Sequence, residues 1–187
     1  MDLSTFGIGP EFKKIFKAAF ERCQIISDKK DATKFYEEGL DLLKKKKIPV
    51  FIVRDFNTTG LFGDPFDPRS NFYRLLVAEG SSSQTGRGGG SHGHGQKAPF
   101  ARSKLRTVYY YSNVKDGIQG TDHKDLFIGK TILNEWKGSD NKRRQHVGYY
   151  GNVNKELLDE KDQPIPLFGD QIPSPVSYTH LRAHETR

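Results

Sequence analysis

The residues with the clearest chemical potential lie in a glycine-rich stretch, GRGGGSHGHGQKAPF, which runs from Gly86 to Phe100. Glycines let the backbone approach a ligand closely, so consecutive N–H groups can point at one anion. We expect APFARSKL, which follows Lys97, to form a short helix whose N-terminus adds a partial positive charge. Lys97 supplies a mobile ammonium group. The stretch therefore predicts a phosphate-binding loop, with a plain flexible linker as the alternative.

Two other interpretations of this stretch are weaker. A Walker P-loop requires a lysine directly after its last glycine, whereas Gln96 follows Gly95 here. His92 and His94 form a His-x-His pair, but no Cys, Asp or Glu lies nearby in the sequence to complete a metal site. We therefore expect no metal site and interpret both histidines as polar loop residues.

A second group of candidate residues follows the apolar run at 48–53, which predicts a buried strand. Asp55 would then lie at the rim of a pocket, where its carboxylate can accept a hydrogen bond from an exocyclic amino group such as that of adenine. Asn57 and Thr58 offer further polar groups, and Gly60 permits a close approach of the backbone. The alternative is an aspartate that only stabilises a turn.

Two helices are predicted before this run. Apolar residues recur every three or four positions over residues 10–26, and Pro10 suits a first helical turn. Cys23 lies on that apolar stripe, so we interpret it as a buried small hydrophobic residue. A second helix is predicted over residues 31–46, with Asp31 as its cap.

The remaining elements follow the Asp55 turn. Ser70 can cap a short helix that Gly80 can end. RTVYYYS at 106–112 and LFIGKTIL at 126–133 predict two strands, which a glycine-containing turn region can join as a hairpin. No element is assigned after residue 134. This order favours an α+β fold, a two-layer sandwich with helices on one face of a mixed sheet.

Composition narrows the class of protein. The 187 residues suffice for one domain, and 30 Lys and Arg against 23 Asp and Glu give a net charge of +7, which favours anionic partners. One cysteine excludes a disulfide framework, and the reducing cytoplasm is the expected compartment. No apolar run approaches the roughly 20 residues that a membrane helix needs, and the N-terminus does not resemble a signal peptide.

The two motifs together resemble those of the GHKL ATPases, which include gyrases, heat-shock chaperones and histidine kinases. DFNTTGL at 55–61 is similar to the D-x-G-x-G turn of that family, and GSHGHGQKAPFARSKLRTVYYYS at 90–112 is similar to its ATP lid with the helix and strand that follow. The whole pattern also resembles a group of bacterial GHKL-type ATP-binding proteins. The resemblance implies the Bergerat fold, here incomplete at both ends, and ATP and Mg²⁺ as cofactors.

The resemblance also implies roles for individual residues. Asp55 would bind the adenine, and Gly60 would close the turn around it, with Asn57 and Thr58 beside them. The lid would consist of residues 86–97, with Gly90, Gly93 and Gly95 as its glycines, followed by Gln96 and by Lys97 as the lysine that faces the phosphates. A homodimer of the full-length protein and a neighbouring nucleic-acid-binding domain are further options that the resemblance implies.

Three departures from the family pattern limit what we expect. Asn57 stands where the first glycine of the turn is expected, and Gln96 precedes Lys97. The E-x-x-x-N helix, whose Glu acts as general base and whose Asn holds Mg²⁺, has no counterpart before Asp55. We therefore expect a parent ATPase, but a fragment that binds ATP without a catalytic residue of its own.

The C-terminal stretch VSYTHLRAHETR, at 176–187, resembles the translation of a sequencing adapter. We therefore expect a partial ATP-binding domain over residues 1–175 and an artificial tail over 176–187.

The alternative function is a basic nucleic-acid-binding module. It rests on the net charge, on the lysine run at 44–47, on NKRRQH at 141–146 and on the tyrosines at 109–111. Aromatic side chains among basic residues can stack on bases. Because neighbouring residues of a strand point to opposite faces, however, we expect at least one of the tyrosines to lie in the core.

Overall fold

The computed structural model describes residues 10–26, 30–64, 67–77, 94–115, 117–118, 122–138, 140–152 and 164–172. The chain divides into two compact units. The first unit consists of Met1–Arg54, Ser103–Thr107 and Thr131–Gly148. The second unit consists of Asp55–Arg102, Val108–Lys130 and Tyr149–Arg187.

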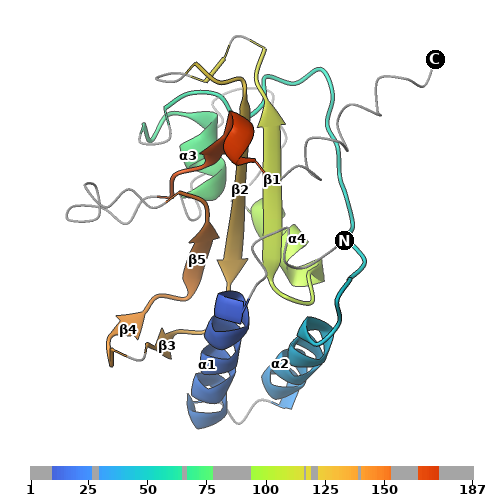
Figure 1. Cartoon of the computed structure of the whole chain (residues 1–187), viewed down its shortest axis with the longest axis vertical. Helices are drawn as coiled ribbons and strands as arrows, with labels where there is room; N and C mark the ends of the chain where they lie inside the picture. The colour runs from blue at the N-terminus through green and yellow to red at the C-terminus, as the bar shows by residue number, and fades with distance from the viewer. Residues whose placement is uncertain are drawn as a thin grey trace. The chain divides into compact units, whose positions relative to one another are not determined.

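The first unit begins with two helices, α1 (Pro10–Ile26) and α2 (Lys30–Leu43) (Figure 1). The helix predicted over residues 10–26 is confirmed. The second helix begins one residue before Asp31, so this carboxylate lies in the first turn, near the positive end of the helix dipole. It ends at Leu43, before the lysine run at 44–47. Residues 44–46 form a turn and bends, and Lys47 lies in an isolated β-bridge.

Aromatic rings hold α1 and α2 together. Phe16 is fully buried, and its ring centroid lies 5.1 Å from that of Tyr36 and 5.9 Å from that of Phe35. Gly39 lies where an added Cβ would collide with the Phe16 ring, so the absence of a side chain lets the two helices approach. Cys23 is fully buried, as predicted.

The hydroxyl of Tyr36 provides a polar contact in this core. Its oxygen accepts a hydrogen bond from the backbone N–H of Asn134 at 2.9 Å. Burial raises the pKa of Tyr36 to about 12, although the same hydrogen bond acts in the opposite direction. The neutral phenol is therefore favoured in the folded unit.

The first unit also contains a short hairpin of β3 (Trp136–Lys137) and β4 (Arg143–Arg144), which the sequence did not predict. Trp136 lies opposite Arg144, and the guanidinium carbon lies 5.9 Å from the centroid of the Trp136 ring. This cation–π contact joins the two antiparallel strands across the turn.

In the described part of the chain, four strands form the main sheet, in the order β1 (Thr107–Asn113), β2 (Asp125–Ile132) and β5 (Val147–Tyr150), with β6 (Leu167–Phe168) also paired to β2. The two predicted strands are thus confirmed, with β1 and β2 running in opposite directions (Figure 1). The described sheet is antiparallel rather than mixed as predicted, and Leu126 of β2 lies opposite Phe168 of β6.

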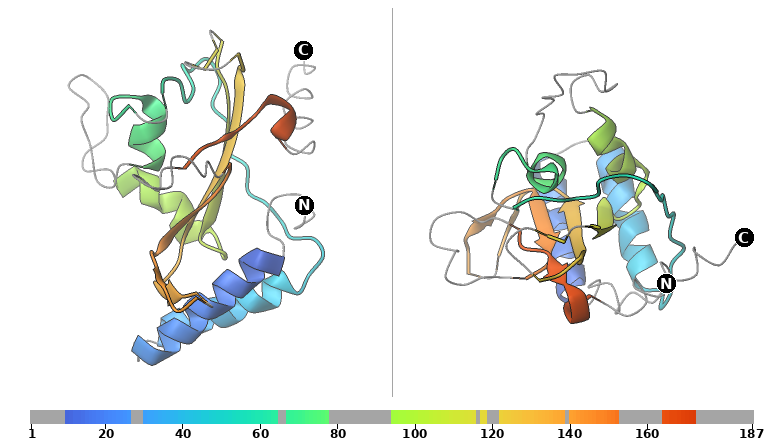
Figure 2. Two further views of the ribbon diagram at one scale, coloured as in Figure 1. Left: turned by 60° about the vertical axis from the view of Figure 1, so that its left-hand side comes forward. Right: turned by 90° about the horizontal axis from the view of Figure 1, so that it is seen from above.

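The second unit carries its helices on one side of β1 and β2 (Figure 2). These are α3 (Asn71–Leu76) and α4 (Ala98–Arg102), preceded by the 3₁₀ helix η2 (His94–Lys97); a further 3₁₀ helix, η3 (Gly169–Gln171), follows β6. Ser70 caps α3 as predicted, because its hydroxyl oxygen accepts a hydrogen bond from the Tyr73 N–H at 3.0 Å. The predicted stop at Gly80 lies outside the described residues.

The core of the second unit lies between α3 and the sheet. Phe72 and Leu76 of α3 are fully buried against Leu126 and Ile128 of β2, and Val114 and Ile118 complete the cluster. Together with the strands and the other helices, this packing confirms the predicted α+β class.

The buried strand predicted at 48–53 is wrong. The segment has no strand pairing, and Phe51 and Val53 keep 90% and 74% of their surface exposed. The apolar run has the composition of a strand, but in the described part of the chain no neighbouring strand pairs with it, so the sheet lacks the further strand that the sequence suggested.

We expect the free energy of unfolding to decrease as the pH rises from 10 to about 12. The unfolded chain releases the Tyr36 proton near its ordinary pKa of 10, whereas the folded unit keeps it up to about 12, so the stabilisation present below pH 10 is lost across this interval. Tyr36→Phe removes this pH-dependent contribution. It should also lower the free energy of unfolding by about 1 kcal/mol at neutral pH, because the hydrogen bond is lost. Urea unfolding of both proteins at neutral and alkaline pH measures the effect. An equally steep decrease in the variant would contradict it.

Candidate functional site

The backbone of the Asp55 turn takes unusual angles at two of the predicted site residues. Asn57 has a φ of 59° and Gly60 a φ of 71°, both in the left-handed region. Asparagine tolerates this region better than most residues with a side chain. Asn57 is the residue that stands where the first glycine was expected from the sequence resemblance. Asp55, Asn57 and Thr58 are all exposed.

Gly60 anchors the turn against strand β1. An added Cβ at Gly60 would lie 2.6 Å from the Ser112 hydroxyl oxygen, so only glycine fits without a shift. The same oxygen accepts a hydrogen bond from the backbone N–H of Leu61 at 2.9 Å, and Ser112 itself is buried. The backbone at Gly60 thus lies close to β1, whereas its predicted close approach to a ligand stays a prediction.

The N-terminal end of α3 holds the turn from a second direction. The Asn71 side-chain amide donates to the Gly60 carbonyl at 3.3 Å and lies 3.4 Å from the Thr59 hydroxyl oxygen. A turn that combines two left-handed residues with contacts to a strand and a helix has a well-defined backbone, although the carboxylate of Asp55 at its start is exposed.

The C-terminal end of α3 contacts the segment that follows the glycine-rich stretch. The Gln96 side-chain amide donates to the Arg74 carbonyl at 3.0 Å. Lys130 of β2 donates to the Leu76 carbonyl at 2.7 Å, and the Tyr149 hydroxyl donates to the same oxygen at 2.9 Å. Lys130 keeps only 6% of its surface exposed, so this ammonium group belongs to the interior of the unit.

The two motifs are therefore tied to opposite ends of one short helix. Asn71 and Arg74, which make these contacts, are three residues apart, which corresponds to about 4.5 Å along a helix axis. The Asp55 turn contacts the first end, and Gln96 contacts the second. The structure thus brings together parts of both predicted motifs within the second unit.

The predicted lid residues are only partly described. Gly90, Gly93 and His92 lie outside the described residues. Gly95, Gln96 and Lys97 belong to η2, and Lys97 is exposed at its end, directly before α4. The short helix expected after Lys97 is confirmed as α4.

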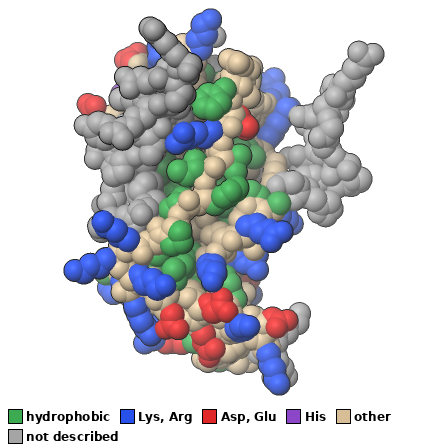
Figure 3. All heavy atoms as spheres, turned by 90° about the vertical axis from the view of Figure 1, so that its right-hand side faces the viewer, with side chains coloured by type: hydrophobic (Ala, Val, Ile, Leu, Met, Phe, Trp, Pro, Cys, Tyr) green, Lys and Arg blue, Asp and Glu red, His purple; other side chains and the backbone are tan. Residues whose placement is uncertain are grey.

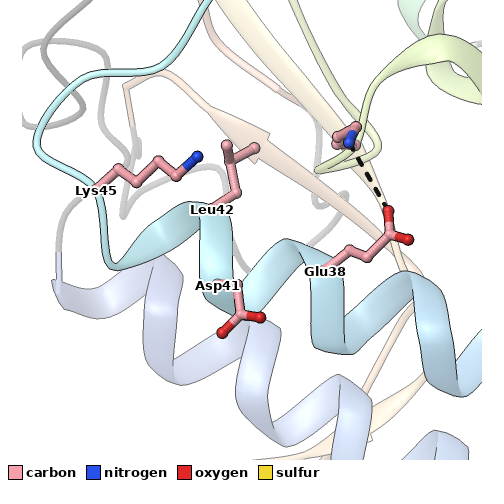
Figure 4. Close-up of a pocket in the computed structure, with 5 residues that line it drawn as sticks. Glu38, Asp41, Leu42 and Lys45 are labelled. Carbon is pink, nitrogen blue, oxygen red and sulfur yellow. Dashed lines mark ion pairs between the residues drawn. The ribbon is translucent and has the colours of Figure 1, made fainter.

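A pocket of about 220 Å³ lies on the first unit and includes none of the predicted site residues. Its lining residues are Glu38, Asp41, Leu42, Lys45 and Lys104 (Figure 4). Both of its carboxylates are in ion pairs: Glu38 lies 3.8 Å from the Lys104 ammonium, and Asp41 lies 2.7 Å from that of Lys44, which does not line the pocket. All four of these side chains are largely exposed, so the pocket has the character of a solvated helix surface.

The tyrosines of the alternative function are engaged with other residues. The Tyr109 ring is stacked on Phe127 at a centroid distance of 5.5 Å, and the Tyr111 hydroxyl donates to Asp125 at 3.0 Å. Burial raises the pKa of Tyr110 and Tyr111 to about 12. None of the three side chains is exposed, so they offer no open stacking surface.

The basic side chains of that alternative are also partly neutralised. Arg143 pairs with Glu135, and Arg144 pairs with Asp140 at 2.7 Å. The hydrogen bond from Arg144 lowers the pKa of Asp140 below its usual value. A nucleic-acid-binding module stays a prediction that no contact in the described residues favours.

Two general features complete the description. Among the described residues, no group of three His, Cys, Asp or Glu side chains could hold a metal ion. None of the described helices combines the length and the apolar character that crossing a membrane requires.

Comparisons with models of protein families, with curated proteins and with solved structures give no match for this chain.

We expect Gly60→Ala to lower the free energy of unfolding by at least about 1–2 kcal/mol. Alanine must adopt the left-handed conformation, and its Cβ collides with the Ser112 hydroxyl. Gly148→Ala is the matched control, because an added Cβ there meets nothing within 4 Å and alanine is at least as good as glycine in a strand. Chemical denaturation of both variants compares them. If Gly60→Ala and Gly148→Ala had the same free energy of unfolding, the turn would not be held as described.

Proposed function

We propose that this chain binds ATP through the Asp55 turn and the glycine-rich stretch at 86–97, as a module of a GHKL-type ATPase. The observation that carries the proposal is the left-handed conformation of Asn57 and Gly60 in a turn held by β1 and α3. The two residues that stand where the family motif has glycines both have a left-handed backbone here, which supports the proposal.

The base would be bound by the turn. The exposed Asp55 carboxylate can accept a hydrogen bond from the exocyclic amino group of adenine, and an ionised acceptor makes this a comparatively strong bond. Asn57 and Thr58 expose polar groups on the same turn. Because Gly60 is fixed against Ser112, binding of the base does not require the turn to be ordered first.

The phosphates would be bound by the second motif. Lys97 is exposed at the end of η2, whereas the Gln96 side chain is held by the Arg74 carbonyl, so Lys97 is the better candidate for a phosphate contact. The roles of Gly90, Gly93 and Gly95 stay predictions from the sequence. Mg²⁺ would neutralise the charge of the phosphates, and no described cluster of side chains would hold it independently of the nucleotide.

We expect Asp55→Ala to weaken the binding of ATP about 10- to 100-fold, because one charged hydrogen bond is lost. GTP should bind weakly to the unmodified chain, since guanine presents a carbonyl oxygen where adenine has its amino group, and a carboxylate cannot donate to it. Isothermal titration calorimetry with ATP and with GTP measures both effects. Asp122→Ala removes another exposed carboxylate of the same unit and is the control. Undetectable binding of ATP to the unmodified chain would refute the proposal.

We also expect this chain to bind ATP without hydrolysing it. The sequence lacks the E-x-x-x-N pair that would supply a general base and hold Mg²⁺. Phosphate release should therefore stay at the level of a protein-free control when Mg²⁺ and ATP are both in excess. Phosphate release above the level of the control would contradict this expectation if Asp55→Ala abolished it.

A further inference from the structure

The net positive charge of the chain resides in the first unit. This unit contains 18 Lys and Arg against 10 Asp and Glu, which gives a net charge of +8. The second unit contains 12 Lys and Arg against 13 Asp and Glu, which gives a net charge of −1. An anionic partner that is selected by charge would therefore bind the first unit.

The segment that follows α2, at 44–54, carries much of this charge. Its sequence, KKKKIPVFIVR, has five cationic residues and no acidic one. Lys44 forms an ion pair with a carboxylate of α2. Lys46, Lys47 and Arg54 are exposed, and no ion pair of the described residues involves them. Their charges are therefore available to a partner.

The centre of the same segment is apolar and open to solvent. Ile48 is buried, but Phe51 and Val53 keep 90% and 74% of their surface exposed. Their neighbours Val50 and Ile52 keep 48% and 54%. Figure 3 shows hydrophobic side chains, with those of lysine and arginine around them, on the face that lies to the right in Figure 1, where this segment runs. An exposed apolar run of this kind marks a protein or membrane interaction site.

We propose that the first unit binds an anionic phospholipid surface through residues 44–54. The lysines and Arg54 would contact the negatively charged headgroups, and Phe51 and Val53 would insert at the boundary between headgroups and acyl chains. The apolar run at 48–53 is far shorter than the roughly 20 residues that span a bilayer, so the segment would lie in the interface.

The combination of charge and apolar surface favours lipid over other anionic partners. A nucleic acid would attract the lysines, but its phosphates offer no apolar surface, and valine and isoleucine cannot stack on bases. An apolar groove of another protein would accept Phe51 and Val53 but would gain little from the flanking cations. A phospholipid layer rewards both properties, because lysine stems can lie along its apolar region while the ammonium groups stay at the headgroups.

This binding uses neither Asp55 nor the glycine-rich stretch, so the inference is independent of the proposed function. All the variants described below keep Asp55. Titration of the same variants with ATP therefore reports on nucleotide binding separately from membrane binding.

Co-sedimentation of the full chain with lipid vesicles tests the proposal. Vesicles of phosphatidylcholine with about 30% phosphatidylserine should bind the chain at least about 10-fold more tightly than pure phosphatidylcholine, because each lysine near an anionic surface contributes about 5-fold. Raising the salt should weaken this binding, because salt screens the charges. No binding to phosphatidylserine vesicles, or equal binding to both kinds, would overturn the proposal.

The apolar contribution is tested by the double variant Phe51→Ser and Val53→Ser. It should weaken binding to phosphatidylserine vesicles at least about 10-fold, because two apolar side chains no longer leave water. Ile25→Ser is the matched control, since Ile25 is 75% exposed and lies near the end of α1, whereas residues 44–54 follow the far end of α2. Unchanged binding of the double variant would show that nothing inserts, and the proposal would fail.

The charge contribution is tested by the double variant Lys46→Gln and Lys47→Gln. It should weaken binding about 5- to 30-fold. The control is Lys13→Gln with Lys30→Gln, which removes the same charge from α1 and α2 and should weaken binding less than about 5-fold. All four lysines are exposed, so neither change should disturb folding. Equal losses in the two double variants would reject residues 44–54 as the site.

A DNA duplex distinguishes lipid from nucleic acid as the anionic partner. We expect the duplex to bind more weakly than the phosphatidylserine vesicles and to be insensitive to Phe51→Ser with Val53→Ser. A duplex that binds as tightly as the vesicles and loses affinity in the same double variant would assign the segment to nucleic acid instead.

Discussion

The second unit depends on how the C-terminal end of α3 is fixed to the sheet. Two sheet side chains, Lys130 and Tyr149, donate to the Leu76 carbonyl. Burying an ammonium group is costly unless it is hydrogen-bonded, and here it also lies 5.8 Å from the centroid of the Tyr149 ring. A helix of six residues is too short to be stable alone, so its position comes from these bonds and from the burial of Phe72 and Leu76.

Because α3 is fixed in this way, its contacts also hold parts of the two motifs in place relative to each other. Its first residue, Asn71, holds the Asp55 turn, and the Arg74 carbonyl near its end holds Gln96. Gln96, which separates Gly95 from Lys97, thus has a structural contact of its own, and Lys97 in the next position is exposed.

Local signals in the sequence predicted the elements but not the contacts that position the site. The apolar spacing of α1, the Ser70 cap and the two long strands each act within a few residues, and all three predictions are confirmed. The contacts of Ser112 and Lys130 join residues 51 and 54 positions apart, so no local pattern specifies them. A lysine inside the apolar run LFIGKTIL was the one visible signal. The short polar strands β3 and β4 gave none.

The apolar run at 48–53 shows the limit of local propensity most clearly. Side chains that favour a strand do so by fitting a pleated, partly buried surface, and the backbone needs a neighbour to accept and donate its hydrogen bonds. Without a neighbouring strand among the described residues, residues 48–53 form no strand, and Phe51 and Val53 stay exposed.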